Sequence, residues 1–161
     1  MTIIKTDMAS KRTDREKKRI LFLCTHNSAR SQMAEGLLRA MQGDRYEAYS
    51  AGIEATTIDP RAVAVMKEIG IDISGQRSKS AEEFQDTIFD HAVTVCDRAR
   101  QACPICSTEL KLPSKSPRAR EVIHRSFEDP AAAIGSEEEQ LQVFRQVRDE
   151  IKYWISQTFG G

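Results

Sequence analysis

The 161-residue sequence has no long apolar run, no excess of charge of one sign and no internal repeat. No stretch approaches the roughly 20 apolar residues that a membrane-spanning helix needs, so we expect no membrane partner. Lysine and arginine together number 24, as do aspartate and glutamate, so bulk charge gives no reason to expect a nucleic acid. Any anion that this protein handles must therefore be bound by local groups.

Residues 1–18 also lack the apolar core of a signal peptide, and we interpret them as a flexible extension before a single domain at 19–161. The expected location is therefore cytoplasmic, a reducing compartment where static disulfides are rare. The chain nevertheless has four cysteines, at positions 24, 96, 103 and 106. Cysteines in that compartment are more often catalytic, redox-active or metal-binding, which makes them the first candidates for a functional site.

Strand-like and helix-like patterns alternate along the chain. Four short apolar runs are typical of strands, at 20–23, 46–50, 89–95 and 122–123. Three segments carry apolar residues at helical spacing, at 33–41, 60–69 and, after a Ser136/Glu139 capping box, 136–155. This order predicts an α/β fold, a three-layer sandwich with a four-stranded parallel sheet and helices on both faces. Segment Lys111–Arg120, with two prolines and several cations, is predicted to be a mobile surface loop.

Two of the cysteines follow predicted strands directly: Cys24 ends the first strand and Cys96 the third. Ligands of parallel α/β sheets bind beyond the carboxyl ends of the strands. Cys24 and Cys96 can therefore share one site.

Cys24 also begins a C-x5-R motif that joins a predicted strand to a predicted helix. The residues between Cys24 and Arg30 are Thr25, His26, Asn27, Ser28 and Ala29. Backbone N–H groups in a tight loop at a helix N-terminus converge on an anion, and an arginine closes the cradle with a fork that suits a tetrahedral oxyanion. The helix dipole and Arg30 should also lower the pKa of Cys24 and give a nucleophilic thiolate.

Two further side chains fit this interpretation. Ser31 is placed to donate a hydrogen bond to the thiolate, and Asn27 to hold the loop by bonding to backbone. The alternative is a buried cysteine at a strand end beside an ordinary helix start, since short motifs have many false matches.

Cys96 and Cys103 are seven positions apart, which is roughly 10 Å along a helix. A disulfide needs Cα atoms within about 7 Å, so a 96–103 bond would require this segment to unwind, as in a redox switch. The alternative is two unpaired structural cysteines. With Cys106 and a histidine they would also supply four zinc ligands, but the usual paired CxxC knuckles are missing and we expect no metal. Cys106 has no assigned role.

Asp129 precedes Pro130, and an acid at such a position can be held rigidly over a neighbouring site as a general acid. Asp-Pro is also a common turn dipeptide.

Together these residues resemble the thioredoxin-coupled arsenate reductases, which share the fold of low-molecular-weight tyrosine phosphatases. The resemblance extends from about Arg19 to about Trp154. Its segments are CTHNSARSQMAEG at 24–36, YSAGI at 49–53, IDIS at 71–74, residues 93–103, DPA at 129–131 and FRQVRDEI at 144–151.

The resemblance implies that Cys24 attacks arsenate held by the loop amides and Arg30, with phosphate or sulfate as analogues, while Asp129 protonates the departing hydroxyl. It implies that Cys96 then attacks Cys24 and releases arsenite. Cys103 would next attack Cys96, and thioredoxin would reduce the 96–103 disulfide. No cofactor is implied. Whether thioredoxin or a glutathione–glutaredoxin couple supplies the electrons stays open.

Three positions depart from the family pattern. His26 stands where glycine is usual, which questions the local backbone, and Ala29 replaces a frequent cysteine. Some relatives bind potassium through residues that match Asn27, Glu35, Ser50 and an acid at the position of Lys79. A lysine there argues against that site, because its ammonium can take the place of the cation.

Two other functions compete with this one. A tyrosine phosphatase would use Cys24, Arg30 and Asp129 equally well, but it would leave Cys96 and Cys103 without a task. Alanines also follow Pro130, where phosphatases of this fold place an aromatic residue. The third hypothesis is a redox-sensing binding module, in which oxidation of Cys24 or Cys96 changes a partner-binding surface.

Overall fold

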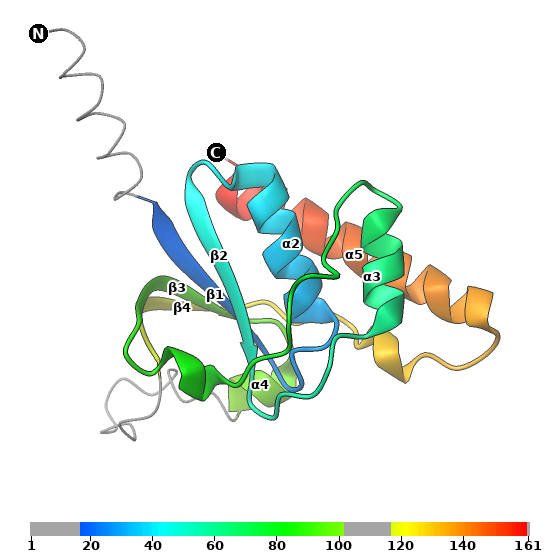
Figure 1. The fold of residues 1–161 in the computed structure, drawn as a ribbon, viewed down its shortest axis with the longest axis horizontal. Helices are drawn as coiled ribbons and strands as arrows, with labels where there is room; N and C mark the ends of the chain where they lie inside the picture. The colour runs from blue at the N-terminus through cyan, green and yellow to red at the C-terminus, as the bar shows by residue number, and fades with distance from the viewer. Residues whose placement is uncertain (1–16, 102–116, 161) are drawn as a thin grey trace, which may run out of the picture.

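The structure of the chain, a computed structural model, describes residues 17–101 and 117–160. Most of the predicted N-terminal extension, Cys103 and Cys106 lie outside the described residues. The elements follow in the order β1 (Lys18–Cys24), α2 (Arg30–Gln42), β2 (Tyr46–Gly52), α3 (Pro60–Lys67), the 3-10 turn η1 (Ala81–Phe84), β3 (Ile88–Thr94), α4 (Asp97–Gln101), β4 (Arg118–His124), the 3-10 turn η2 (Pro130–Ala132) and α5 (Glu137–Phe159) (Figure 1).

The four strands form one parallel sheet in the order β2-β1-β3-β4, which confirms the predicted α/β class. Strand β1 lies in the middle, and its residues 20–23 are fully buried because neighbouring layers cover both faces. In register, Cys24 pairs with Gly52, and Thr94 pairs with His124. The carboxyl ends of all four strands therefore meet at one edge of the sheet.

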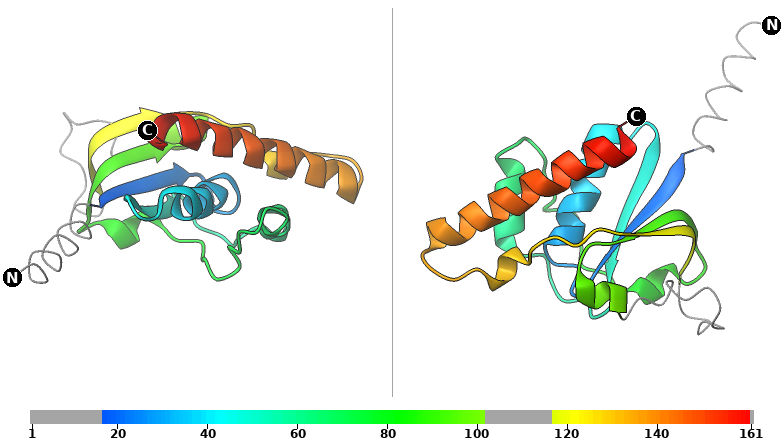
Figure 2. Two further views of the ribbon diagram at one scale, coloured as in Figure 1. Left: turned by 90° about the horizontal axis from the view of Figure 1, so that it is seen from above. Right: turned by 180° about the vertical axis from the view of Figure 1, so that it is seen from behind.

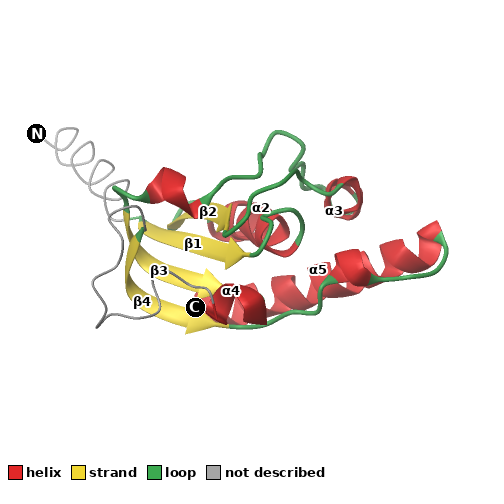
Figure 3. Ribbon diagram, turned by 90° about the horizontal axis from the view of Figure 1, so that it is seen from below, coloured by secondary structure: helices red, strands yellow, loops and turns green. Residues whose placement is uncertain are grey.

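Helices α2, α3 and α5 form a layer on one face of this sheet (Figures 2 and 3). Ile20 and Phe22 of β1 point into that layer, while Leu21 and Leu23 point to the other face. The predicted capping box begins α5, since Ser136 Oγ accepts from the N–H of Glu139. The long C-terminal helix thus starts where its sequence predicts.

The opposite face is covered more thinly. There η1 packs its Phe84 against Tyr49 and Phe89 with edge-to-face rings, centroids 5.5–5.7 Å apart. The three-layer arrangement is confirmed, with unequal layers. In the described ranges, no helix is both long and apolar enough to cross a membrane.

One predicted boundary is wrong. Residues 118–120, assigned to a surface loop, begin β4, where Arg118 and Ala119 pair with Ile88 and Phe89 of β3. Edge strands often carry exposed charges, and Arg118 lies exposed on this one, so no apolar run marks its beginning.

Candidate active site

The loop between β1 and α2 turns its carbonyl oxygens outward. Backbone N–H groups from the segment after β2 donate to them: residue 53 to Cys24 O, 54 to Thr25 O, 56 to His26 O and 59 to Ser28 O. The C=O and N–H of a trans peptide point in opposite directions, so the loop N–H groups face inward at the start of α2. Such inward N–H groups at a helix N-terminus make an anion cradle.

Asn27 holds this loop in shape. It is fully buried and has a φ of 51°, a left-handed conformation that asparagine tolerates better than most residues. Its Oδ1 accepts from the backbone N–H of Lys79 (2.8 Å), and its Nδ2 donates to Ser31 Oγ (2.8 Å). The Ser31 hydroxyl hydrogen is thereby left for another acceptor. Asn27 thus links the cradle to the first turn of α2 and to the chain at Lys79.

The close approach of β2 fixes the same loop from outside. A Cβ atom on Gly52 would lie 2.8 Å from Thr25 O and 2.9 Å from Asn27 N, which are backbone atoms that cannot move aside. Only a glycine allows β2 to end this near to the cradle. His26 has no positive φ, so glycine is not required at that position. Ala29, buried, is the N-cap residue of α2.

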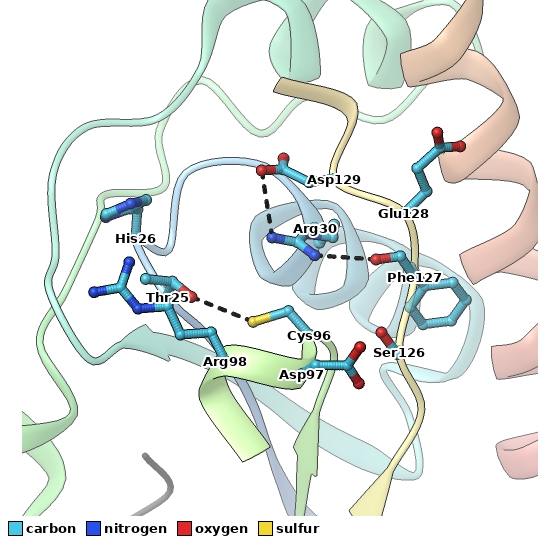
Figure 4. Close-up of a pocket in the computed structure, with 10 residues that line it drawn as sticks. All are labelled: Thr25, His26, Arg30, Cys96, Asp97, Arg98, Ser126, Phe127, Glu128 and Asp129. Atoms are coloured by element: carbon cyan, nitrogen blue, oxygen red, sulfur yellow. Dashed lines mark hydrogen bonds and ion pairs between the residues drawn. The ribbon is translucent and has the colours of Figure 1, made fainter. Parts of the chain in front are cut away.

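Arg30, the first residue of α2, links the cradle to the segment that contains Phe127 and Asp129. Its Nη1 donates to Phe127 O (3.0 Å), and its Nη2 lies 3.8 Å from Asp129 Oδ2 (Figure 4). Asp129 Oδ1 accepts from the N–H of Ala131, which fixes the carboxyl group at the start of η2. The Arg30 side chain is 12% exposed and that of Asp129 is 48% exposed. The carboxyl group therefore stands at the solvent side of the guanidinium.

The two described cysteines meet below the cradle. Cys24 Sγ lies 3.8 Å from Cys96 Sγ, and both thiols are free and buried. Thr25 Oγ1 is 3.4 Å from Cys96 Sγ, and the N–H of Ala99 in α4 donates to that sulfur at 3.3 Å. Adjacent strands bring together residues 72 positions apart in the sequence.

The contact makes the two thiols share one negative charge. The hydrogen bond from Cys24 lowers the pKa of Cys96 to about 5 against the effect of burial, and Thr25 and Ala99 act in the same direction. The hydrogen bond to Cys96 raises the pKa of Cys24, as burial does, although Arg30 opposes both. This differs from the lowered pKa expected for Cys24, because a shared sheet edge predicts a common site for the two thiols but not a hydrogen bond between them.

A cavity of about 480 Å³ opens over these groups. The described residues that line it include Cys96, Arg30 and Asp129, and Phe127 is the single Phe, Tyr or Trp among them (Figure 4). Two rim residues, His26 and Arg98, converge on Glu54: His26 Nδ1 contacts Glu54 O at 3.1 Å, and Arg98 Nη2 lies 3.6 Å from Glu54 Oε1. Neither Arg98 nor Glu54 could be singled out from the sequence, because their contact depends on how α4 lies against the segment after β2.

Behind the loop, the Lys79 ammonium group lies beside the buried Glu35 carboxylate. Lys79 Nζ lies 3.6 Å from Glu35 Oε1, which also accepts from Ser50 Oγ at 2.6 Å. Burial lowers the pKa of Lys79, and the Glu35 carboxylate opposes that shift. In the described part of the chain no group of three or more His, Cys, Asp or Glu side chains is placed to hold a metal ion.

Known proteins are similar to this chain in sequence and in fold. Residues 19–159 match the family model for low molecular weight phosphotyrosine protein phosphatase. The arsenate reductase of Halalkalibacterium halodurans is 48% identical over 135 residues, covering 84% of this chain and 90% of that protein. The arsenate reductase of Bacillus subtilis is 47% identical over 136 residues, covering 84% and 91%.

Solved structures of arsenate reductases and phosphatases have a similar fold. An arsenate reductase in its phosphate-binding state superimposes with a TM-score of 0.63 at 31% identity, covering 89% of this chain and 97% of the other. A low molecular weight protein tyrosine phosphatase from T. tengcongensis gives a TM-score of 0.69 at 28% identity, covering 89% and 99%. The chain therefore belongs to the low-molecular-weight phosphotyrosine protein phosphatase family, within the group that contains these arsenate reductases.

Proposed function

We propose that this protein is an enzyme that reduces arsenate to arsenite, with Cys24 as nucleophile and Cys96 as the thiol that releases the product. The observation that carries the proposal is the 3.8 Å contact between Cys24 Sγ and Cys96 Sγ at the end of an oxyanion cradle. A phosphatase needs one thiol there, whereas reduction of arsenate needs a second thiol to complete a disulfide. The relatives named arsenate reductase support the same substrate.

The first step is formation of a bond between sulfur and arsenic. Arsenate binds to the inward N–H groups of the loop and to Arg30, and the shared proton passes from Cys24 to Cys96 across their contact. The Cys24 thiolate then attacks arsenic. Asp129, held beside Arg30, protonates the departing hydroxyl, which leaves as water.

The second step reduces the arsenic. Cys96 passes its proton to an oxygen of the arsenic adduct and attacks Cys24 Sγ, so that an S–S bond forms and the S–As bond breaks. The electron pair of that bond remains on arsenic, which leaves as arsenite. Because the sulfurs already lie 3.8 Å apart, the step requires little movement of the strands that carry them.

Regeneration involves residues outside the described part of the chain. We assign Cys103 as the thiol that attacks Cys96, and thioredoxin as the reductant of the resulting 96–103 disulfide. Cys96 directly precedes α4, so a bond to Cys103 requires that helix to rearrange. A reducing cytoplasmic location suits this chemistry. We also assign residues 19–161 to the catalytic domain and 1–18 to an extension, supported by a family match that begins at residue 19.

The second candidate is a tyrosine phosphatase. The same cradle would hold phosphate, and the fold likeness to a phosphatase supports this reading. Against it, three alanines follow Pro130, and Phe127 is the single Phe, Tyr or Trp among the described residues of the cavity wall, so a phenol ring finds little to pack against. We expect at most a weak phosphatase activity.

Arsenate-dependent consumption of NADPH tests the activity and the electron donor together. The purified protein is supplied separately with thioredoxin plus its reductase, and with glutathione plus glutaredoxin and its reductase. We expect turnover with the thioredoxin system and none in Cys24→Ser. Consumption of aryl phosphate alone would favour the phosphatase, and activity toward neither substrate would favour a redox sensor.

Single-cysteine variants test the relay. Cys96→Ser should still hydrolyse an aryl phosphate but lose arsenate reduction, because no thiol remains to attack Cys24. Cys103→Ser should reduce arsenate once and stop as a 24–96 disulfide, which mass spectrometry of a tryptic digest detects. Cys106→Ser, the matched control, should turn over normally. Many cycles by Cys103→Ser would contradict its role, and a 96–106 disulfide there would identify the substitute.

A further inference from the structure

His124, at the carboxyl end of β4, is a titratable side chain that the proposed relay does not use. It pairs with Thr94 in the register of β3 and β4. Its Nδ1 lies 2.7 Å from Thr94 Oγ1, and its Nε2 lies 3.2 Å from Asp97 Oδ1. Because a carboxylate only accepts, Nε2 carries the hydrogen of the second contact whether or not the ring is protonated. The imidazole therefore links the end of β3 to the first residue of α4.

The contact with Thr94 prepares the ring to hold Asp97. Thr94 is fully buried, the His124 side chain is 26% exposed and that of Asp97 is 73% exposed. A ring held at its buried end loses little further freedom when its outer nitrogen binds the carboxylate, so this contact costs less entropy than a free surface pair. The strands pair without it, since the N–H of Arg125 donates to Thr94 O at 2.9 Å.

Helix α4 depends on such contacts because it is short. Its five residues, Asp97–Gln101, make less than two turns, and an isolated helix of that length is unstable in water. Among the described side chains of α4, Ala99 is fully buried, and Arg98 lies 3.6 Å from Glu54 in a pair whose side chains are 64% and 60% exposed. Exposed pairs of this kind contribute little. Of these two polar contacts, the one between Asp97 and His124 is the better anchored.

The group that α4 positions is the sulfur of Cys96. Cys96 directly precedes the helix, and its Sγ accepts from the N–H of Ala99 at 3.3 Å, as the side chain of an N-cap residue does. The same sulfur contacts Cys24 Sγ and Thr25 Oγ1, which belong to β1 and to the loop that follows it. Of these three contacts, the one with Ala99 depends on where α4 lies.

We propose that His124 is a positioning residue for Cys96: by holding Asp97, it keeps α4 where the N–H of Ala99 reaches the sulfur. Loss of the contact with Asp97 frees the first turn of α4 and removes one donor from the Cys96 thiolate. The part that this plays in the second chemical step rests on the proposed arsenate reduction, in which Cys96 attacks Cys24 Sγ. The effect on the sulfur itself does not, because every group involved is present without substrate.

Two substitutions of His124 separate its two contacts. Asparagine places its amide near the position of the imidazole Nδ1, so it retains only the contact with Thr94. Glutamine places an N–H near the position of Nε2, so it retains the donor to Asp97. The Cβ chemical shift of Cys96, measured by NMR on isotopically labelled protein without arsenate, follows the protonation of the thiol between about pH 4 and 8.

We expect His124→Asn to raise the midpoint of this titration by about 0.4–1 pH unit, the roughly two- to tenfold effect of one hydrogen bond. His124→Gln should stay close to the wild-type midpoint. Exchange of the Ala99 N–H with deuterium should be faster in His124→Asn alone. An unchanged midpoint in His124→Asn would overturn the proposal, and so would equal shifts in the two variants.

Asp97→Ala provides the control for the charge of the carboxylate. A carboxylate next to Cys96 also disfavours its thiolate directly, so this substitution alone changes the titration for two reasons. In an Asp97→Ala background, however, His124→Asn should cause no further shift, because the partner is already absent. A shift as large as in the wild-type background would show that His124 does not act through Asp97, and would overturn the proposal.

Single-turnover formation of the 24–96 disulfide with arsenate, measured on the same preparations, reports separately on the proposed function. We expect this step to be slower in His124→Asn than in His124→Gln. If the wild-type protein formed no such disulfide, the proposed arsenate reduction would fail, whereas the NMR titrations would still decide the role of His124.

Discussion

Asp129 is the residue on which the rate of the first chemical step should depend most directly. Its carboxyl group lies 3.8 Å from Arg30 and is fixed by the N–H of Ala131. In Asp129→Asn the amide oxygen can still accept from Ala131, so the position of the side chain is preserved while the acidic proton is lost. We expect the first step to slow by about 10²–10⁴-fold with nearly unchanged oxyanion binding.

Single-turnover kinetics with arsenate, together with calorimetric titration of phosphate, measure both quantities for Asp129→Asn. If the variant reacts as fast as the wild type at neutral pH, the acid lies elsewhere, and Glu128 in the same cavity wall is the next candidate.

Cys96 gives a prediction about pH. Its pKa is lowered to about 5, so the thiolate is present above that pH and is lost only as the pH falls through it. Alkylation of Cys96 should therefore be nearly independent of pH between about 6 and 8, whereas an ordinary thiol gains about tenfold per unit in that range. Peptide-resolved mass spectrometry with iodoacetamide measures the rate at this residue.

The matched control is Cys24→Ala, which removes the first donor to Cys96. Its alkylation should show a midpoint at a higher pH. A rate that rises steeply between pH 6 and 8 in the wild-type protein would mean that the pair does not share its charge in this way.

At the scale of elements, the end of β2 shapes the cradle as much as the loop itself does. A Cβ on Gly52 would approach two backbone atoms of the loop to within 3 Å, whereas a Cβ on Gly75 would meet nothing within 4 Å. Gly52→Ala should lower the free energy of unfolding by about 1–3 kcal/mol, as overpacking does, and weaken phosphate binding. Gly75→Ala should change neither quantity.

Urea unfolding and phosphate titration of Gly52→Ala and Gly75→Ala provide the comparison. Equal phosphate affinity for both would show that the loop tolerates a shift of β2, and that the cradle does not depend on this contact.

Helix α5 supplies a large part of the core and gives a prediction at the scale of the whole molecule. Ile151 is fully buried in the larger core cluster, while Tyr153 on the same helix is 68% exposed. Ile151→Ala should lower the free energy of unfolding by about 2–5 kcal/mol through lost burial and the cavity it leaves. Tyr153→Ala should cost about 0.5 kcal/mol or less. Chemical denaturation of both variants checks the difference, and similar losses would mean that α5 is not anchored through this face.

The whole fold shows which features a sequence can predict. The cradle was predictable because Cys24, Arg30 and the start of α2 are adjacent in the chain, and the capping box of α5 is equally local. The contact between Cys24 and Cys96 was predictable as a shared sheet edge, but the 3.8 Å separation was not. That distance, the Glu54–Arg98 pair and the start of β4 depend on strand register and loop packing, which no short segment encodes.

The placement of Cys24 on β1 and Cys96 after β3 also sets the order of events during synthesis. The two residues are 72 positions apart, so at about 5–20 residues per second Cys96 leaves the ribosome roughly 4–14 seconds after Cys24. During this interval the nascent chain carries an oxyanion-loop cysteine without its partner. The reactive pair therefore arises only when β3 has docked beside β1, which ties redox competence to the pairing of these two strands.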